Sequence, residues 1–221
     1  MLHYEVDPAA LQLQVPFELD TFNGRAYVSL VAFELQRMAI DGAPRLINQA
    51  VGAVASNRFL NVRTYVRGGG IFFLAEWLDN APAVLLGPIF YGLPYRLGQL
   101  DYDHQGDLRG SIEAGASLAY HGRAAGPFAR AERGSRTEFL MERYTALTAR
   151  LRRRSFRVEH EPWPQAAADV VVEDDSLIHA TGPWFRAARF CGATFSPGVD
   201  VVMHMPRTLR NIQPRMLYSR A

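Results

Sequence analysis

Short apolar runs separated by polar turns predict that the chain is built mainly from β-strands. Residues 24–35 are apolar and rich in β-branched and aromatic side chains, which is typical of a strand buried on both faces. Residues 61–66 alternate instead, so Arg63 and Tyr65 fall on the polar face of that strand. Residues 71–78 predict the next strand, and the three glycines before it suit a tight antiparallel turn.

Later segments extend this pattern and add one clear helix. Further strands are predicted at residues 111–121, 155–160, 168–172 and 199–205. Ser135 and Glu138 match a capping box, so a helix is predicted to begin at Ser135. The helix is predicted to pack on the sheet through an apolar stripe at helical spacing, which consists of Leu140, Tyr144, Leu147 and Leu151.

Length and composition fit one globular domain. The 221 residues are 48% hydrophobic and contain no internal repeat or low-complexity linker, so a single core can form. We predict one domain over residues 1–205 and a loosely held basic tail over residues 206–221. The expected fold class is α+β and predominantly β.

The basic residues limit the available chemistry. All 24 are arginines and 22 acidic residues oppose them, so the net charge of +2 is too small for a dedicated nucleic-acid binder. Because the sequence has no lysine, no side-chain amine can form an imine with a carbonyl substrate or with pyridoxal phosphate. Lysine-dependent covalent catalysis is excluded, and no cofactor is expected.

The sequence shows no signal for export or membrane insertion. Cys191 is the single cysteine, so the fold needs no disulfide and a cytoplasmic location is expected. The first eight residues lack the charged start and apolar run of a secretory signal. Residues 81–93 form the longest apolar stretch, but prolines and glycines interrupt it and it is shorter than the roughly 20 residues that span a bilayer. We therefore expect no membrane partner.

Several motifs carry a family resemblance. The chain resembles the bacterial family typified by YqjF over residues 4–182, through the segments N-V-R-T-Y-V, G-G-I-F-F-L, Y-G-L-P-Y-R-L-G, T-E-F-L-M-E-R-Y and H-E-P-W-P. That family is placed beside acetoacetate decarboxylase. Residues 4–20 resemble the opening strand and helix of that enzyme, and residues 78–83 resemble the segment leading to its active centre. The resemblance implies an acetoacetate decarboxylase-like fold, a closed antiparallel sheet or barrel with packed helices.

The resemblance also places decarboxylase active-site positions on this sequence. Where the decarboxylases carry two consecutive lysines, this chain has Tyr95 and Arg96, so a phenol stands at the imine-forming position and a guanidinium at its neighbour. A catalytic carboxylate of the decarboxylases would fall near Ser56 or Asn57 and is absent. The chain is therefore not expected to be a Schiff-base decarboxylase.

In such a fold, Arg63, Tyr65, Tyr95 and Arg96 are candidate ligand-binding residues. They would line the mouth or floor of the closed sheet, where an arginine can hold a carboxylate with two hydrogen bonds. Alternatively, the two arginines pair with nearby acidic residues and only stabilise the strands. A guanidinium beside Tyr95 would lower the pKa of its phenol and suit it to acid-base chemistry or oxyanion stabilisation.

Glu76 and His160 are further candidates. Glu76 lies in an otherwise apolar strand, so its carboxylate must face solvent, pair with a cation, or carry a raised pKa in a pocket. Pairing with an arginine is the simpler expectation, and proton transfer is the alternative. His160 is a candidate ligand-binding residue that titrates near neutral pH, or it lies at a solvent-facing strand end.

Other kinds of site have little support. Asp101, Asp103 and His104 offer three potential metal ligands within four residues, but no second ligand motif accompanies them, and no metal site is predicted. Arginines are concentrated over residues 123–157, where a solvated helix face is favoured over contact with RNA.

The leading hypothesis is a protein that binds a small anionic or carbonyl ligand, such as an organic acid, without covalent capture. It would be either a binding protein or a non-covalent acid-base enzyme that uses Tyr95 and Glu76. The competing hypothesis is a scaffold that contacts its partners, including copies of itself in a homo-oligomer, through the arginine-rich helix. A cavity filled by Tyr91, Tyr95 and Trp77 would favour the scaffold.

Overall fold

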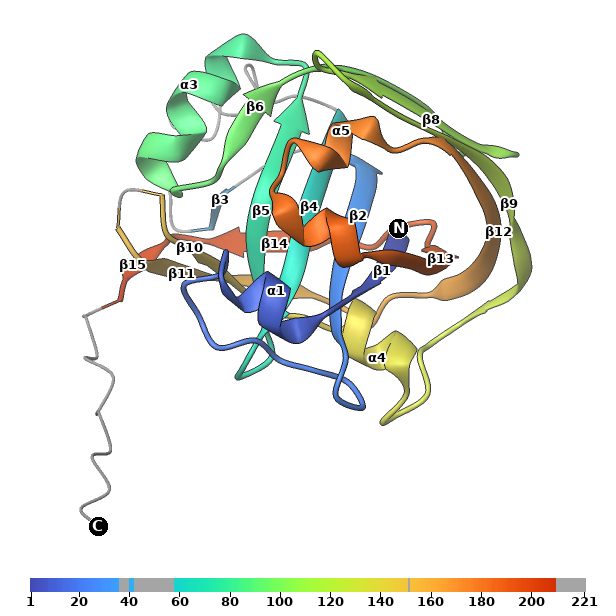
Figure 1. The fold of residues 1–221 in the computed structure, drawn as a ribbon, viewed down its shortest axis with the longest axis horizontal. Coiled ribbons are helices and arrows are strands. Elements are labelled where there is room, and N and C mark those ends of the chain that lie inside the picture. The colour runs from blue at the N-terminus through green and yellow to red at the C-terminus, as the bar shows by residue number, and fades with distance from the viewer. Residues whose placement is uncertain (36–39, 42–57, 151, 210–221) are drawn as a thin grey trace.

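Most of the described chain forms one strongly curved sheet (Figure 1). The computed structural model describes residues 1–35, 40–41, 58–150 and 152–209, the side chains of residues 40, 41 and 86 excepted. The strands are β1 (Leu2–Val6), β2 (Ala26–Glu34), β3 (Ile40–Asp41), β4 (Arg58–Val66), β5 (Gly70–Leu78), β6 (Tyr95–Leu97), β7 (Gln99–Asp103), β8 (Leu108–Glu113), β9 (Ser117–Ala129), β10 (Thr145–Thr148), β11 (Arg154–His160), β12 (Gln165–Asp174), β13 (Arg189–Phe195), β14 (Val201–His204) and β15 (Arg207–Thr208). The helices are α1 (Pro8–Gln12), α3 (Ala81–Phe90), α4 (Arg136–Met141) and α5 (Ser176–His179), with a 3-10 helix η1 (Pro183–Ala187).

The sheet is mixed, and its two ends do not meet. The strand order is β3-β14-β11-β10-β5-β4-β2-β1-β13-β12-β9-β8-β7, with β6 paired to β5 and β15 to β11. Most neighbours are antiparallel, but β10 and β6 run parallel to β5, and β3 runs parallel to β14. The predominantly β fold with few helices is confirmed, and the expectation that the sheet closes into a barrel is wrong.

The sheet stays open because β4 has no free edge where β7 approaches it. β4 is already paired with β2 on one side and with β5 on the other. Side chains bridge the opening instead: Tyr102 of β7 donates to the Phe59 carbonyl of β4 at 3.1 Å. Arg58 of β4 donates to the Leu100 carbonyl at 3.1 Å and pairs with Asp101 at 2.9 Å. We call this side-chain-bridged opening the seam.

Two apolar layers lie on the two faces of β2, β4 and β5. The inner layer fills the hollow of the curved sheet, where Trp77 and Trp184 are almost fully buried. Figure 1 shows α5 and η1 at the mouth of this hollow. The outer layer packs Tyr65 and Phe73, on the opposite face, against Leu140 of α4 and Phe156 of β11. The polar residues described below share the face that carries the outer layer.

The strands of the N-terminal half agree with the sequence pattern. Residues 24–35, 61–66 and 71–78 correspond to β2, β4 and β5, and the last two form the predicted antiparallel hairpin. Gly68 and Gly69 in its turn have φ values of +87° and +75°, which glycine adopts without strain. The opening strand and helix implied by the resemblance are present as β1 and α1.

The later strands differ in extent from the prediction. Residues 111–121 contain a hairpin of β8 and β9 rather than one strand, because Gly115 turns the chain with a φ of +77°. Residues 155–160, 168–172 and 199–205 fall within or around β11, β12 and β14. β15 lies in the predicted tail and pairs with β11, and residues 210–221 of that tail lie outside the described residues.

The predicted helix is shorter than its apolar spacing suggested. It begins as expected, with the Ser135 hydroxyl accepting from the Glu138 N–H at 3.1 Å, but it ends at Met141. The next residues form β10, which is hydrogen-bonded to β5 on one side and to β11 on the other. Pairing on both edges outweighs the helical spacing of Tyr144 and Leu147. Leu151 lies outside the described residues.

The expectation of an arginine-rich helix is therefore wrong. α4 contains a single arginine, Arg136, and the arginines over residues 150–157 belong to the β10–β11 connection and to β11. A scaffold that makes contacts through such a helix has no support in the described structure.

Candidate functional site

Three strands bring polar residues into one row on the face that carries the outer layer. Asn61 of β4 pairs with Glu76 of β5, and Glu76 pairs in turn with Tyr95 of β6. Residues directly opposite each other in neighbouring strands project from the same face of a sheet. The sequence candidates Glu76 and Tyr95 are therefore neighbours.

Glu76 is a buried carboxyl group with no ion pair among the described residues. The residue is only 5% exposed, and its Oε2 has no hydrogen-bond partner in the described part of the chain. Burial raises the pKa of this carboxyl to about 8. Glu76 therefore keeps its proton at neutral pH and can donate it. The expected pairing with an arginine is not found among the described residues.

Tyr95 lies at the end of the row, against α3. Its ring packs on Gly87, where any Cβ atom would overlap it, and its centroid is 6.4 Å from that of Phe59. Burial raises the pKa of the phenol well above its usual value, and the neighbouring Glu76 and Tyr91 raise it further. This direction is the opposite of the expected lowering, so Tyr95 is a hydrogen-bond donor at neutral pH.

Arg63 and Tyr65 follow Asn61 at two-residue steps along β4. Both donate to the Leu140 carbonyl, Arg63 through Nη2 at 3.1 Å and Tyr65 through its hydroxyl at 3.0 Å. The Nε of Arg63 is buried and has no partner. One side of the guanidinium is thus fixed by α4, while its Nε–H remains available to an acceptor.

A series of buried hydrogen bonds holds the Tyr65 hydroxyl in place. The Tyr65 hydroxyl is 2.5 Å from the Ser29 hydroxyl, which is 2.8 Å from Nδ1 of His3. Nε2 of His3 lies 3.0 Å from the Thr194 hydroxyl. Burial lowers the pKa of His3 well below its usual value, so the imidazole is neutral and can donate at one nitrogen and accept at the other. These hydrogen bonds orient the Tyr65 hydroxyl toward the Leu140 carbonyl, which also accepts from Arg63.

Unpartnered buried atoms concentrate on this face of the sheet. In the described part of the chain, six buried side-chain nitrogen or oxygen atoms lack a partner, and four belong to Asn61, Arg63, Glu76 and Tyr91. Tyr91 follows α3 and lies in the outer layer, close enough to raise the pKa of Tyr95. Such atoms are rare in folded proteins, which normally pair them with protein or ordered water. We call Asn61, Arg63, Glu76, Tyr91 and Tyr95 the polar face.

Arg96 belongs to the other side of the sheet. Its guanidinium lies over the Trp77 ring, 5.1 Å from the centroid, and donates to the Ala180 carbonyl at 3.1 Å. Adjacent residues of a strand point in opposite directions, so Tyr95 and Arg96 do not line one site. Trp77 belongs to the inner layer and Tyr91 to the outer one, so these two and Tyr95 do not fill a common cavity.

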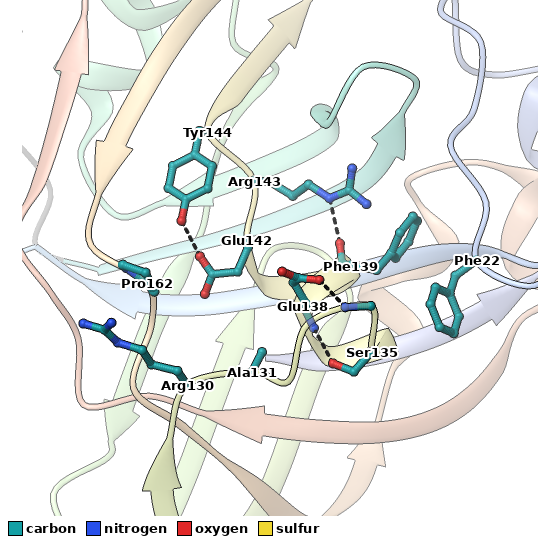
Figure 2. Close-up of a pocket in the computed structure, with 11 residues that line it drawn as sticks. Phe22, Arg130, Ala131, Ser135, Glu138, Phe139, Glu142, Arg143, Tyr144 and Pro162 are labelled. Atoms are coloured by element: carbon teal, nitrogen blue, oxygen red, sulfur yellow. Dashed lines mark hydrogen bonds between the residues drawn. The ribbon is translucent and has the colours of Figure 1, made fainter.

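His160 lies beside a different pocket. Its ring stacks on Tyr144 at 4.5 Å and on Trp163 at 4.7 Å. Figure 2 shows the pocket, of about 580 Å³, which is lined by Phe22, Arg130, Ala131, Gly134, Ser135, Glu138, Phe139, Glu142, Arg143, Tyr144 and Pro162. Its carboxylates are already hydrogen-bonded, Glu142 to the Tyr144 hydroxyl and Glu138 to the Gly134 N–H. This pocket does not include the polar face.

Asn61 and Tyr91 are the members of the polar face that sequence reasoning missed. Asn61 stands two residues before Arg63 in an alternating strand, and that spacing already indicated a shared face. Tyr91 has no comparable signal. It reaches the site through the turn after α3, where the Thr148 hydroxyl donates to the Tyr91 carbonyl at 2.7 Å.

Several remaining features complete the description of the site. Ser56 and Asn57, where the resemblance placed a carboxylate position, lie outside the described residues. Within the part of the chain that the structure covers, no three His, Cys, Asp or Glu side chains converge as a metal site would require. None of the helices described is both long and apolar enough to cross a membrane.

The fold is of the acetoacetate decarboxylase-like class. The structure is similar to acetoacetate decarboxylase from Legionella pneumophila subsp. pneumophila str. Philadelphia 1, with a TM-score of 0.60 and 11% sequence identity over 95% of this chain and 83% of that chain. It is also similar to an acetoacetate decarboxylase-like enzyme from Sphingomonas wittichii RW1, with a TM-score of 0.54 and 16% identity over 87% of this chain and 83% of that one. At such identities the likeness defines the fold alone.

Within that class, the chain belongs to the family DUF2071, described as "Uncharacterized conserved protein", whose model matches residues 1–200. The chain is also 32% identical over 193 residues to YqjF of Bacillus subtilis (strain 168), an alignment that covers 81% of this chain and 77% of that protein. The resemblance to the YqjF-like family, carried by the sequence motifs, is confirmed.

Proposed function

We propose that the protein binds a small organic acid or carbonyl compound at the polar face, without a covalent bond. The observation that carries this proposal is the concentration of unpartnered buried atoms on Asn61, Arg63, Glu76 and Tyr91. A carboxylate or carbonyl oxygen would accept from the Arg63 Nε–H and from the protonated Glu76. Each such bond would satisfy a buried group, whose unpaired state is unfavourable.

The chemistry of the chain favours non-covalent binding. No lysine is present in the sequence, and the resemblance places Tyr95 at the position of the imine-forming lysine of the decarboxylases. Two residues of a strand span roughly 7 Å, so the distance from Asn61 to Arg63 suits a ligand of a few carbon atoms. Acetoacetate, for which the structurally similar enzymes are named, is of this size and class.

The test is calorimetric titration of the purified protein with acetate, pyruvate, acetoacetate and acetone. We expect at least one of these compounds to bind and Arg63→Gln to weaken it about tenfold or more, because a charge-assisted hydrogen bond is lost. Arg96→Gln is the matched control, since Arg96 lies on the opposite face. Equal effects of the two substitutions, or no binding by any compound of the panel, would contradict the proposal.

The pH dependence of binding gives an independent test. Above pH 8, Glu76 loses its proton and places a negative charge beside the ligand. We therefore expect the affinity for a carboxylate ligand to be constant at lower pH and to fall as the pH rises through about 8. Glu76→Gln should flatten this profile, and an identical profile in the variant would count against the assigned role of Glu76.

Proton transfer is a second candidate function, favoured by the pairing of Glu76 with Tyr95. A carboxyl with a pKa of about 8 exchanges its proton readily near neutral pH. The ionised form would take a proton from the carbon beside a ligand carbonyl, while Tyr95 donates a hydrogen bond to the enolate oxygen. In deuterated water, NMR should show deuterium entering the methyl group of pyruvate faster than in buffer, and both Glu76→Gln and Tyr95→Phe should slow it. Exchange no faster than in buffer would exclude this function.

A further inference from the structure

Three large apolar side chains of the helix α3 are exposed. Its sequence, A-P-A-V-L-L-G-P-I-F, contains no polar side chain at all. Leu85 is 72% exposed, Ile89 58% and Phe90 60%. Leu97 of β6, the strand that packs beside α3, is 55% exposed. We call Leu85, Ile89, Phe90 and Leu97 the apolar patch.

The side of α3 that faces the protein carries small or compact residues instead. Gly87 packs on the Tyr95 ring without room for a Cβ atom, and Pro88 is buried. An amphipathic helix of a water-soluble domain normally turns its large apolar residues toward the core. Leu85, Ile89 and Phe90 point away from the described part of the protein instead, so the apolar patch does not serve the packing of the described fold. Exposed large apolar side chains that gather on neighbouring elements, rather than occurring singly, are typical of a contact with another molecule.

An arginine of the connection between β10 and β11 contacts the C-terminal end of α3. Arg154 Nη1 donates to the Ile89 and Phe90 carbonyls at 2.9 and 2.5 Å, which satisfies groups that a helix leaves unpaired at its end. The strand that precedes this connection ends at Thr148, whose hydroxyl is bonded to the carbonyl of Tyr91, the C-cap of α3. The β10–β11 connection therefore starts and finishes beside this helix end, as Figure 1 shows.

The side chains of this connection are basic and exposed. They include Arg150, Arg152 and Arg153. Burial lowers the pKa of Arg96, and Arg150 lies close enough to Arg96 to lower that pKa further. Arg207 of β15 lies opposite Ser155 of β11 and is exposed as well. We call Arg150, Arg152, Arg153 and Arg207 the arginine rim. The protein therefore presents an apolar patch and a positively charged rim near each other.

We propose that this apolar patch and its arginine rim dock the protein on an anionic lipid surface. Membrane-surface helices combine apolar side chains that enter the headgroup region with basic residues that contact the phosphates. A protein partner is a poorer match, because protein interfaces carry regular hydrogen bonds and α3 has no polar side chain to make one. A second copy of the chain would bring two arginine rims of like charge together.

The expectation of no membrane partner, drawn from the sequence, rested on the lack of a spanning segment. It does not bear on a peripheral contact. α3 has ten residues, about 15 Å at 1.5 Å per residue, so it would lie in the plane of the interface.

The test is co-sedimentation of the purified protein with vesicles of phosphatidylcholine, with and without phosphatidylglycerol. We expect binding to the anionic vesicles at low salt and little binding to the neutral ones. Leu85→Ser with Phe90→Ser, and separately Arg150→Glu with Arg152→Glu, should each reduce the bound fraction several-fold. Leu13→Ser is the matched control, because Leu13 is 90% exposed but lies at the end of α1.

Both double variants change exposed residues, so unchanged melting temperatures are expected to show that they are folded. Absence of binding to anionic vesicles, or an equal loss in Leu13→Ser, would overturn the proposal. Loss of a dimer in the Leu85→Ser, Phe90→Ser variant, measured by light scattering, would also overturn it and would assign the patch to a second copy. Ligand titration at the polar face is independent of all these outcomes.

Discussion

Glu76 shows how one side chain can oppose the stability of the fold that holds it. An unfolded glutamate ionises near pH 4.5, whereas burial raises the pKa of folded Glu76 to about 8. Between these values the folded protein keeps a proton that the unfolded chain has released. The free energy of unfolding therefore falls as the pH rises from 4.5 to 8 and is constant above this range. Residues at binding and catalytic sites often carry such a penalty.

We predict that Glu76→Gln stabilises the protein at high pH. The change in pKa corresponds to at most about 5 kcal/mol, and we expect a gain of roughly 2 kcal/mol or more at about pH 9. At about pH 3 the variant and the parent should have similar stability, because Glu76 is then protonated in both the folded and the unfolded chain. Urea denaturation at the two pH values measures this difference. Glu113→Gln, at an exposed position of β8, is the control and should show no gain.

Tyr65 provides a second prediction. Its hydroxyl is bonded to the Ser29 hydroxyl and the Leu140 carbonyl, so Tyr65→Phe removes two buried hydrogen bonds. Ser29 and Leu140 each keep one other partner. We expect a loss of about 1–3 kcal/mol in the free energy of unfolding. Tyr4→Phe is a matched control because the buried Tyr4 hydroxyl has no partner, and its removal should be neutral or stabilising. Equal losses in the two variants would show that the hydrogen bonds do not matter.

The packing of α3 on β6 depends on a glycine inside the helix. Alanine normally stabilises a helix interior by about 1 kcal/mol relative to glycine, but a Cβ at Gly87 would overlap the Tyr95 ring. We therefore predict that Gly87→Ala lowers the free energy of unfolding by about 1–3 kcal/mol. Gly106→Ala is the control, since nothing lies within 4 Å of that position. Thermal unfolding of the two variants distinguishes strain at Tyr95 from a general effect of replacing glycine.

The sequence predicted those features that depend on neighbouring residues. The β4–β5 hairpin and the start of α4 follow from alternation, turn glycines and a capping box, and these signals are local. The same alternation separates Arg96 from Tyr95, but the family resemblance had grouped them as a lysine pair. The neighbouring sequence could not predict that Leu147 lies in a strand, because this depends on parallel pairing with Phe72, about 75 residues earlier.

The candidate site was predictable in part for the same reason. Glu76 stands out as a charge in an apolar strand, and its pairing with Tyr95 follows only once β6 is known to run parallel to β5. No described arginine pairs with Glu76, and the sequence gives no signal for this, because it depends on the direction of side chains from distant strands.

The seam determines which part of the sheet is held least strongly. Between β4 and β7, side chains of Arg58 and Tyr102 replace the backbone ladder. We predict that Arg58→Gln combined with Tyr102→Phe increases amide hydrogen exchange in β7 and β8 about tenfold or more, with little change in β1 and β2. Hydrogen exchange with mass spectrometry measures this, and a uniform increase over the sheet would show global destabilisation instead.

The position of β1 between β2 and β13 also sets when the protein can finish folding. β1 is synthesised before Arg189–Phe195, the strand that covers its second edge, and the two strands lie far apart along the chain. During synthesis that edge offers free amide and carbonyl groups to any passing strand. The sheet can therefore be completed only after Arg189–Phe195 has been made, and until then the unpaired edge of β1 favours aggregation.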